Sequence, residues 1–132
     1  MSLYAWSLKL NFVLSIQNLN INKNMFDFFK TKKNYENLSS DAFKTFLNEN
    51  KNAVLIDVRT AGEFQQKAIK GAVNIDISSG NFQTKIAQLD KNKTYLVYCR
   101  SGNRSGNACK MMGDLGFTKV YNLSGGLMSW SF

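Results

Sequence analysis

The stretch TYLVYCRSGNRSGNACKMMGDLG, residues 94–116, decides the fold. It begins with an apolar run, 94–99, of the kind that forms a strand buried on both faces of a parallel sheet. A loop that contains Gly102 follows, and apolar residues at helical spacing then predict a helix that ends near Gly116. A buried strand that leads through a tight loop into a helix is typical of a parallel α/β sheet.

Other segments repeat this form on either side. Apolar runs occur at 53–57, 71–76 and, more weakly, 120–123. Helical patterns occur at 39–50, 61–68 and 82–89, and Ser39 or Ser40 is the expected N-cap of the first. These alternating elements predict an α/β fold with a central parallel sheet of about four to five strands, flanked by helices on both faces.

The chain length of 132 residues supports one domain with a short appendage. We place the domain at 36–132 and an N-terminal extension at 1–35. Charged and asparagine residues interrupt residues 1–24 too often for a membrane span, which takes about 20 apolar residues. We interpret residues 1–24 as an extension upstream of a natural start at Met25, or as a cloning scar. The alternative is a signal peptide, which would make the protein an exported one.

The composition excludes several kinds of site. The chain has no histidine, which rules out Ser/His/Asp triads, Cys/His dyads and histidine-ligated metal sites. Its two cysteines, Cys99 and Cys109, are too few for a disulfide framework or a zinc site, so we expect a reduced, cytoplasmic protein without metal or cofactor. Cys109 is expected to be a small core residue of the helix, too far from Cys99 to form a disulfide.

The net charge of +8 is spread along the chain without a long basic run. This distribution favours a solvated, lysine-rich surface over a nucleic-acid partner. The surplus of positive charge also raises the local concentration of small anions.

Ligands of parallel sheets bind at the carboxyl ends of the strands, where Asp57, Arg59, Asp76 and the segment CRSGNRS, 99–105, are expected. In that segment a cysteine leaves the strand and Arg104 and Ser105 open the helix. Inward-pointing backbone N–H groups and the helix N-terminus would hold an anion. Together with Arg100 and Arg104 they would lower the pKa of Cys99, giving a thiolate without a histidine base.

Residues 36–130 resemble the single-domain rhodaneses, the thiosulfate sulfurtransferase family. The resemblance rests on VLIDVRTAGEF (54–64), IKGAVNID (69–76), YLVYCRSGNRS (95–105) and LGFTKVYNLSGGLMSW (115–130). It implies that Cys99 is the catalytic nucleophile, which cycles between thiolate and persulfide. Asp57 and Arg59 match the family's DVR motif near the loop. Lys67-Ala68-Ile69 departs from the Gly-His-Ile that is common in the family. The residues that the resemblance implies for the substrate-binding loop are Arg100, Ser101, Gly102, Asn103, Arg104 and Ser105.

The residue chemistry indicates a two-step sulfur transfer. The Cys99 thiolate attacks the outer sulfur of thiosulfate or of a persulfide donor, and a second nucleophile then removes that sulfur. Arg59, Arg100 and Arg104 are candidates for holding the anionic part of the donor. The expected partners are a small anionic sulfur donor and a thiol acceptor, either a small thiol or a thioredoxin-like protein.

Two alternatives stay open. One is a cysteine-dependent phosphatase or arsenate reductase, but those enzymes place an arginine six positions after the cysteine, where this chain has Ser105. The other is a non-enzymatic sulfur carrier or partner-binding module of the same fold. Loss of the cysteine would mark an inactive module, and this chain has Cys99.

Two remaining features have structural interpretations. Glu63 could accept a hydrogen bond from Arg59 as a weak exposed pair. The glycines 125–126 are expected to turn the chain into a short helix from which Trp130 packs on the sheet.

Overall fold

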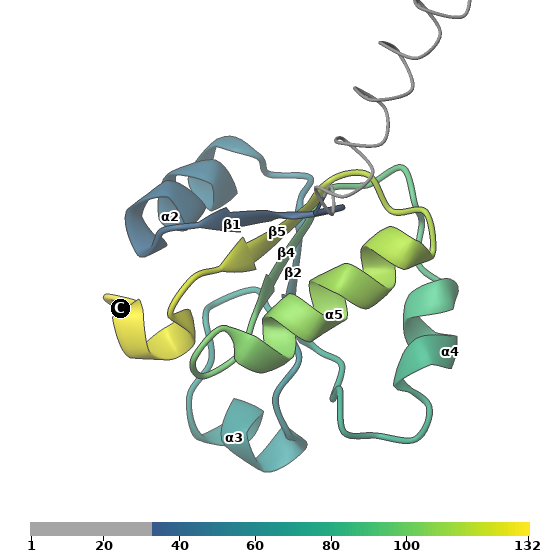
Figure 1. Ribbon diagram of the computed structural model, residues 1–132. Coiled ribbons are helices and arrows are strands. Elements are labelled where there is room, and N and C mark those ends of the chain that lie inside the picture. Colours follow the sequence, from purple (N-terminus) through teal and green to yellow (C-terminus); the bar gives the residue numbers. More distant parts are fainter. Residues whose placement is uncertain (1–32) are drawn as a thin grey trace, which may run out of the picture. The chain divides into compact units, whose positions relative to one another are not determined.

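The computed structural model describes residues 33–132, and the interpretation of residues 1–24 lies outside the described residues. The described part contains a five-stranded sheet in the order β1-β5-β4-β2-β3, with every neighbouring pair parallel (Figure 1). The elements are β1 (Glu36–Leu38), α2 (Ser40–Glu49), β2 (Val54–Asp57), α3 (Ala61–Gln66), β3 (Val73–Asn74), α4 (Phe82–Ala87), β4 (Tyr95–Tyr98), α5 (Asn103–Asp114), β5 (Val120–Leu123) and the 3-10 helix η1 (Gly126–Ser129).

The expected α/β fold is confirmed, and the sheet has one strand that the sequence did not predict. β1 carries the residues ENL, too short and too polar to form an apolar run, and it is ordered by pairing with β5, with Leu38 opposite Leu123. Ser39 is the N-cap of α2, since its side chain accepts a hydrogen bond from Ala42 N. The division into 1–35 and 36–132 stays a prediction.

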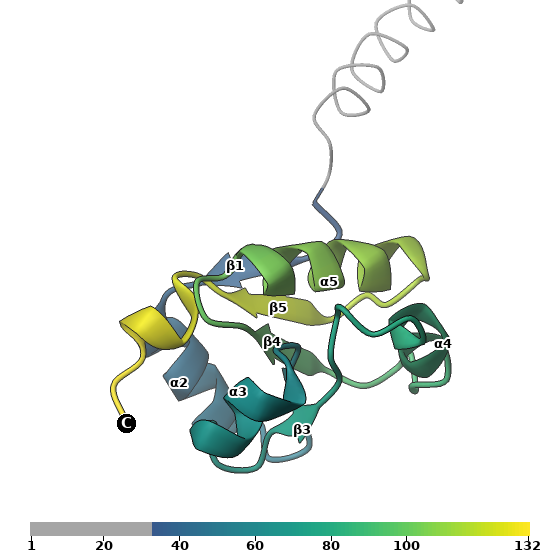
Figure 2. The same cartoon turned by 90° about the horizontal axis from the view of Figure 1, so that it is seen from below.

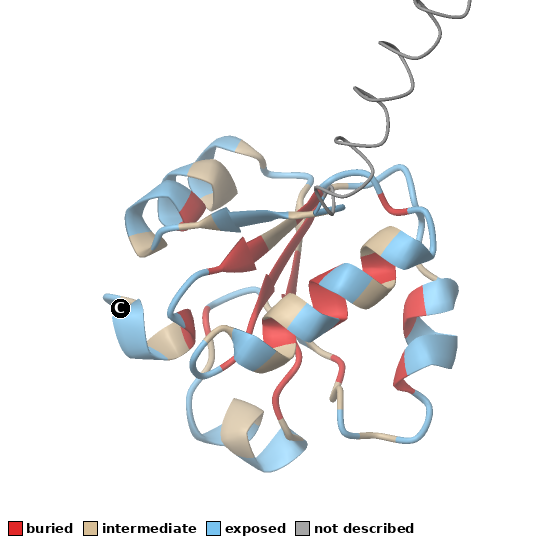
Figure 3. Ribbon diagram, viewed as in Figure 1, coloured by how far each residue is buried: buried red, intermediate tan, exposed pale blue. Residues whose placement is uncertain are grey.

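Two apolar layers hold the helices against the sheet. One layer lies between the sheet and α4 and α5, where Phe82 and Met112 pack with Tyr95 of β4. Tyr95 also meets Phe117 edge to face, with ring centroids 5.3 Å apart. The other layer lies between the sheet and α2, where Phe43 packs against Leu96 and Leu123 of the central strands. Figure 3 shows β4 buried throughout, as expected of a strand covered on both faces.

The elements that contain the predicted site residues lie at the carboxyl ends of the strands. Figures 1 and 2 show α3, the first turn of α5 and η1 at one end of the molecule, beyond the ends of β2, β4 and β5. β3 is shorter than the apolar run at 71–76: Gly71 turns the chain with φ 88°, and the carboxylate of Asp76 accepts hydrogen bonds from Ser78. No helix within residues 33–132 is long and apolar enough to cross a membrane.

Candidate active site

Cys99 lies at the end of β4 and is fully buried. Its Sγ accepts a hydrogen bond from the backbone N–H of Gly102 at 3.1 Å and one from the hydroxyl of Ser105 at 3.3 Å. The chain folds back to make these contacts because Gly102, the N-cap of α5, has φ 98°, which L side chains rarely adopt. A Cβ on Gly102 would also lie 3.1 Å from Gly125 N. The sulfur therefore lies inside a loop whose donors point at it.

The pKa of the Cys99 thiol is lowered from its ordinary value. Burial acts most strongly and by itself would raise the pKa. The hydroxyl of Ser105 and the backbone N–H groups of Ser105, Gly102 and Ser101 favour the thiolate, and together they outweigh burial. The direction agrees with the sequence interpretation, but the leading causes are these hydrogen bonds rather than Arg100 and Arg104.

Arg104 is held by Glu63 of α3. Its two terminal nitrogens donate to the two carboxylate oxygens at 2.8 and 3.0 Å. Glu63 also caps its own helix, since it and Thr60 exchange hydrogen bonds in a capping box. The hydrogen bonds from Arg104 lower the pKa of Glu63 to about 2. The expected pairing of Glu63 with Arg59 is wrong, because the partner of Glu63 comes from 41 residues further along the chain.

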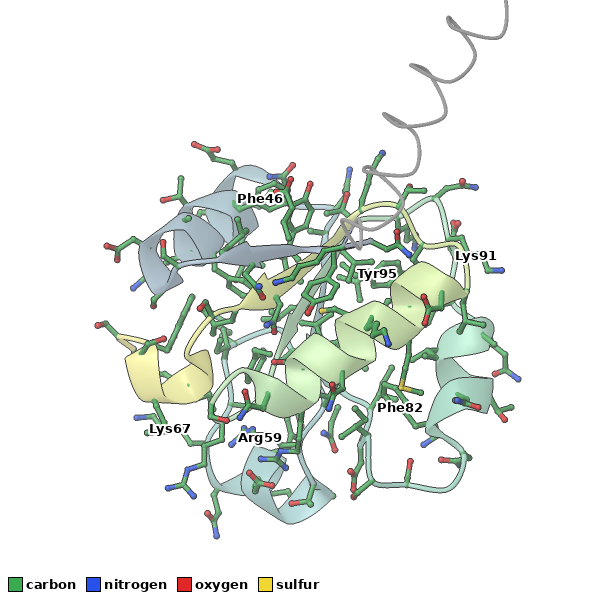
Figure 4. The ribbon with its side chains drawn as sticks, viewed as in Figure 1. Phe46, Arg59, Lys67, Phe82, Lys91 and Tyr95 are labelled. Carbon is green, nitrogen blue, oxygen red and sulfur yellow. The ribbon has the colours of Figure 1, made fainter. Side chains whose placement is uncertain are left out.

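Arg59 and Asp57 form a buried ion pair. The Nη2 atom of Arg59 donates to Asp57 Oδ2 at 2.6 Å and to the carbonyl of Lys67, also at 2.6 Å. The side chain of Asn74 donates to the carbonyls of both Asp57 and Arg59. Burial acts most strongly and by itself would lower the pKa of Arg59, but the hydrogen bonds to Asp57 and the negative charge of Asp57, with smaller contributions from Tyr98 and Glu63, together outweigh it and the pKa is raised. Figure 4 shows Arg59 beside α3, so the pair ties the end of β2 to the segments after α3 and to β3.

The three candidate arginines are therefore placed differently. Arg59 is bound to Asp57 and Arg104 to Glu63. Arg100 is exposed, and it has no ion pair with another residue of the described part of the chain. Asn103, the first residue of α5, is exposed beside the loop.

The segment after β5 supports the loop from outside, a role that the sequence interpretation missed. The backbone N–H of Leu127 donates to the carbonyl of Cys99 at 2.9 Å, and that of Met128 donates to the carbonyl of Arg100 at 3.0 Å. A side chain on Gly126 would overlap the backbone of both Cys99 and Arg100. In the sequence, the signal of this contact is the pair of adjacent glycines at 125–126. In the structure both have positive φ.

Other singled-out residues lie outside this group. The Asp76 carboxylate is used in its local turn. Cys109 is buried in the core, where burial raises the pKa of its thiol, and both cysteines are free. Trp130 packs edge to face on Phe43 of α2, with ring centroids 6.0 Å apart. No cluster of three or more metal-ligating side chains occurs among residues 33–132.

Comparison with known proteins places the same region in a recognised group. A family model described as "Rhodanese-like domain" matches residues 39–132. The putative sulfurtransferase YtwF of Bacillus subtilis is 40% identical over 93 residues, which cover 70% of this chain and 87% of that protein. The thiosulfate sulfurtransferase PspE of Escherichia coli is 39% identical over 70 residues, which cover 53% of this chain and 67% of that protein.

Solved structures agree. A rhodanese-like domain protein from Staphylococcus aureus superposes with a TM-score of 0.65 at 26% identity, covering 73% of this chain and 91% of that one. A structure described as a rhodanese with anions from E. coli superposes with a TM-score of 0.51 at 35% identity, covering 61% of this chain and 93% of that one.

Proposed function

The chain belongs to the rhodanese-like domain family, and we propose that it moves sulfane sulfur from thiosulfate or a persulfide donor to a thiol acceptor through a persulfide on Cys99. The observation that carries the proposal is the set of donors around the Cys99 sulfur: the hydroxyl of Ser105 and the N–H groups of Ser101, Gly102 and Ser105. These groups stabilise the thiolate form of Cys99, which the reaction requires, in a chain that has no histidine to act as a base.

The two half-reactions follow from this geometry. The Cys99 thiolate attacks the outer sulfur of thiosulfate; a new S–S bond forms, the bond within thiosulfate breaks, and sulfite leaves with the electron pair. The acceptor thiolate then attacks the terminal sulfur of the persulfide and restores the Cys99 thiolate. The negative charge stays at the loop in both resting forms, so the same fixed donors stabilise both.

Arg100 is the residue that we propose for holding the anionic end of the donor. Arg59 and Arg104 are already bound to carboxylates, whereas Arg100 is exposed next to Cys99. A guanidinium binds a sulfonate group with two parallel hydrogen bonds, as it does a carboxylate or phosphate. The E. coli relative described as containing anions is consistent with an anion site in this fold.

The phosphatase and arsenate reductase alternative is disfavoured. Such a site needs a free arginine six residues after the cysteine to hold a tetrahedral oxyanion, and here Ser105 occupies that position and donates its hydroxyl to the sulfur. Arg104, one position earlier, is engaged by Glu63. The carrier or binding-module alternative differs only in turnover, so an assay of turnover separates it from catalysis.

Thiocyanate formation from thiosulfate and cyanide tests the proposal. The wild-type chain should turn over repeatedly, and Arg100→Ala should raise the KM for thiosulfate about tenfold, because one charge-assisted contact is lost. Lys110→Ala is the matched control, since Lys110 is an exposed cation on α5. A single turnover without repetition would identify a carrier, and no sulfur uptake at all would refute the proposed function.

A further inference from the structure

Asn122 is a buried polar side chain in an otherwise apolar part of the sheet. It is 4% exposed on β5, an interior strand whose next residue, Leu123, packs in the core. Asparagine is depleted in strands, and a buried carboxamide costs free energy unless each of its polar atoms has a partner. The Oδ1 atom of Asn122 has none among the described residues. Packing and stability therefore do not account for an asparagine here, and such exceptions are expected at functional sites.

The side-chain nitrogen of Asn122 explains why its oxygen is unpaired. The nitrogen donates to the carbonyl of Gly102 at 3.2 Å and to Oδ1 of Asn37 at 2.9 Å. Both partners are acceptors, so the nitrogen has to face them, and the oxygen is left without a donor. The side chain thus uses its two N–H groups on two fixed acceptors at the expense of its own acceptor.

Gly102 connects Asn122 to the active site. Its N–H donates to the Cys99 sulfur at 3.1 Å, and its carbonyl accepts from Gly106 N and from Asn122. Glycine adopts many backbone conformations, so Gly102 needs outside contacts to keep the φ of 98° that directs its N–H at the sulfur. The segment η1 holds the beginning of the loop, at 99–100, and Asn122 holds its end.

Asn37 of β1 orients Asn122 in turn. The two asparagines are opposite each other in the parallel pair of β1 and β5, so the register of the sheet brings their side chains together. Figure 2 shows β1 beside β5, with α5 running alongside both. A hydrogen-bonded series therefore runs from Asn37 through Asn122 to Gly102, and it joins the edge strand β1 to the loop around Cys99.

We propose that Asn122 is a positioning residue of the active site, which holds Gly102 so that its N–H stays directed at the Cys99 sulfur. Asn37 fixes the orientation of Asn122. The side-chain and backbone groups that donate to the sulfur belong to the loop and to Ser105, so both asparagines act through Gly102. Donors that are held in place stabilise a developing negative charge without having to reorganise. The effect on sulfur transfer rests on the proposed function, whereas the effect on the thiolate does not.

The test measures the midpoint of iodoacetamide labelling of Cys99 against pH in the full chain. Asn122→Leu keeps the branched shape of the side chain but removes the donor, so the midpoint should rise by about half a pH unit. The kcat/KM for thiosulfate at pH 7 should fall about threefold. The melting temperature should change by less than about 4 °C, because the variant also removes the unpaired Oδ1.

Val120→Ala is the matched control for a change in the core. Val120 is buried at the other end of β5, where it pairs with Tyr95, so the variant should lower the melting temperature and leave the labelling midpoint unchanged. The charge of Arg104 and the thiol of Cys109, which interact with the Cys99 thiolate, are the same in every variant. A rise in the midpoint therefore reports the placement of the donors rather than a changed charge.

Asn37 supplies a second variant that does not disturb the core, because Asn37 is exposed. Asn37→Ala removes the acceptor that orients Asn122, and the midpoint should rise by about 0.3 pH units. Asn107→Ala is its control, since it removes an exposed asparagine of α5 that is not part of the series, and it should leave the midpoint unchanged. If Asn122→Leu does not fold, Asn37→Ala decides the question.

An unchanged midpoint in folded Asn122→Leu or, where that variant does not fold, in Asn37→Ala would overturn the inference. An equal rise in Val120→Ala would also overturn it, because the shift would then be a general effect of lost stability. Labelling involves no sulfur transfer, so the two proposals fail separately. Predicted midpoint shifts in a chain that transfers no sulfur would refute the proposed function and support the role of Asn122 at the thiolate.

Discussion

The two cysteines of this chain are equally buried, but the pKa values of their thiols are shifted in opposite directions. Both Cys99 and Cys109 have no exposed surface and both are free thiols. Burial pushes both pKa values upward, and at Cys109 nothing outweighs it. At Cys99 the hydrogen bonds of the loop outweigh burial and the pKa is lowered. Access to solvent therefore does not distinguish Cys99, the proposed nucleophile, from Cys109, whereas the hydrogen-bond donors around each sulfur do.

The backbone explains why only one cysteine finds such donors. The first four N–H groups of a helix have no partner within the helix, and Ser105 lies in the first turn of α5. Cys109 lies in the interior of the same helix, where N–H groups bond to carbonyls one turn earlier, and its neighbours are apolar side chains of the core. The position of each cysteine relative to the start of α5 therefore determines whether N–H groups can donate to its sulfur and lower the pKa of its thiol.

Removing each sulfur in turn should give the largest contrast. Cys99→Ser should reduce sulfur transfer at least about 1,000-fold, because the proposed nucleophile is lost. Cys109→Ala should retain transfer within about twofold and lower the free energy of unfolding by about 1 kcal/mol. Thiocyanate formation and thermal unfolding measure the two effects. Equal loss of transfer in both variants would remove the distinction between the two cysteines.

Disturbing the support of the loop should come next in size. Gly126→Ala places a Cβ against the backbone of Cys99 and Arg100, so we expect transfer to fall about tenfold or more, with a clear loss of stability. Gly62→Ala is the control, since a Cβ at Gly62 of α3 meets nothing within 4 Å. Wild-type activity in Gly126→Ala would show that η1 does not hold the loop in place.

Taking away one donor should move Cys99 toward the behaviour of Cys109. Ser105→Ala removes the hydroxyl that bonds to Sγ, and we expect the midpoint of iodoacetamide labelling against pH to rise by about one pH unit. Ser101→Ala keeps its backbone N–H and should leave the midpoint unchanged. An unshifted midpoint in Ser105→Ala would assign the lowered pKa to another cause.

Glu63→Gln should have the smallest effect. The ion pair with Arg104 is about a third exposed, so it contributes less than about 1 kcal/mol, and transfer at pH 7 should fall by no more than about threefold. Because the folded protein lowers the pKa of Glu63 from 4.5 to about 2, its contribution is present above pH 4.5 and is lost as the pH falls towards 2. Acid unfolding of the wild-type chain and of Glu63→Gln should therefore converge near pH 2, and parallel curves would contradict this.

The sequence predicted the elements whose signals are local. The buried strand, the loop at Cys99 and the helix after it are encoded within 94–116, and each has its expected place. Contacts between distant segments escaped prediction. Glu63 accepts hydrogen bonds from Arg104, which lies 41 residues further along the chain. The short, polar strand β1 forms by pairing with β5. The role of the glycines at 125–126 was missed for the same reason, since their neighbours are Cys99 and Arg100.

The most direct measurement of the central claim is the site at which sulfur is carried. The full chain is incubated with thiosulfate, freed of excess donor, digested without reductant and analysed by mass spectrometry. The account predicts an added mass of ~32 Da, one sulfur atom, on the peptide that contains Cys99, removed by a dithiol and absent from Cys109. Sulfur on Cys109 in folded protein, or no sulfur on Cys99 while transfer proceeds, would contradict it.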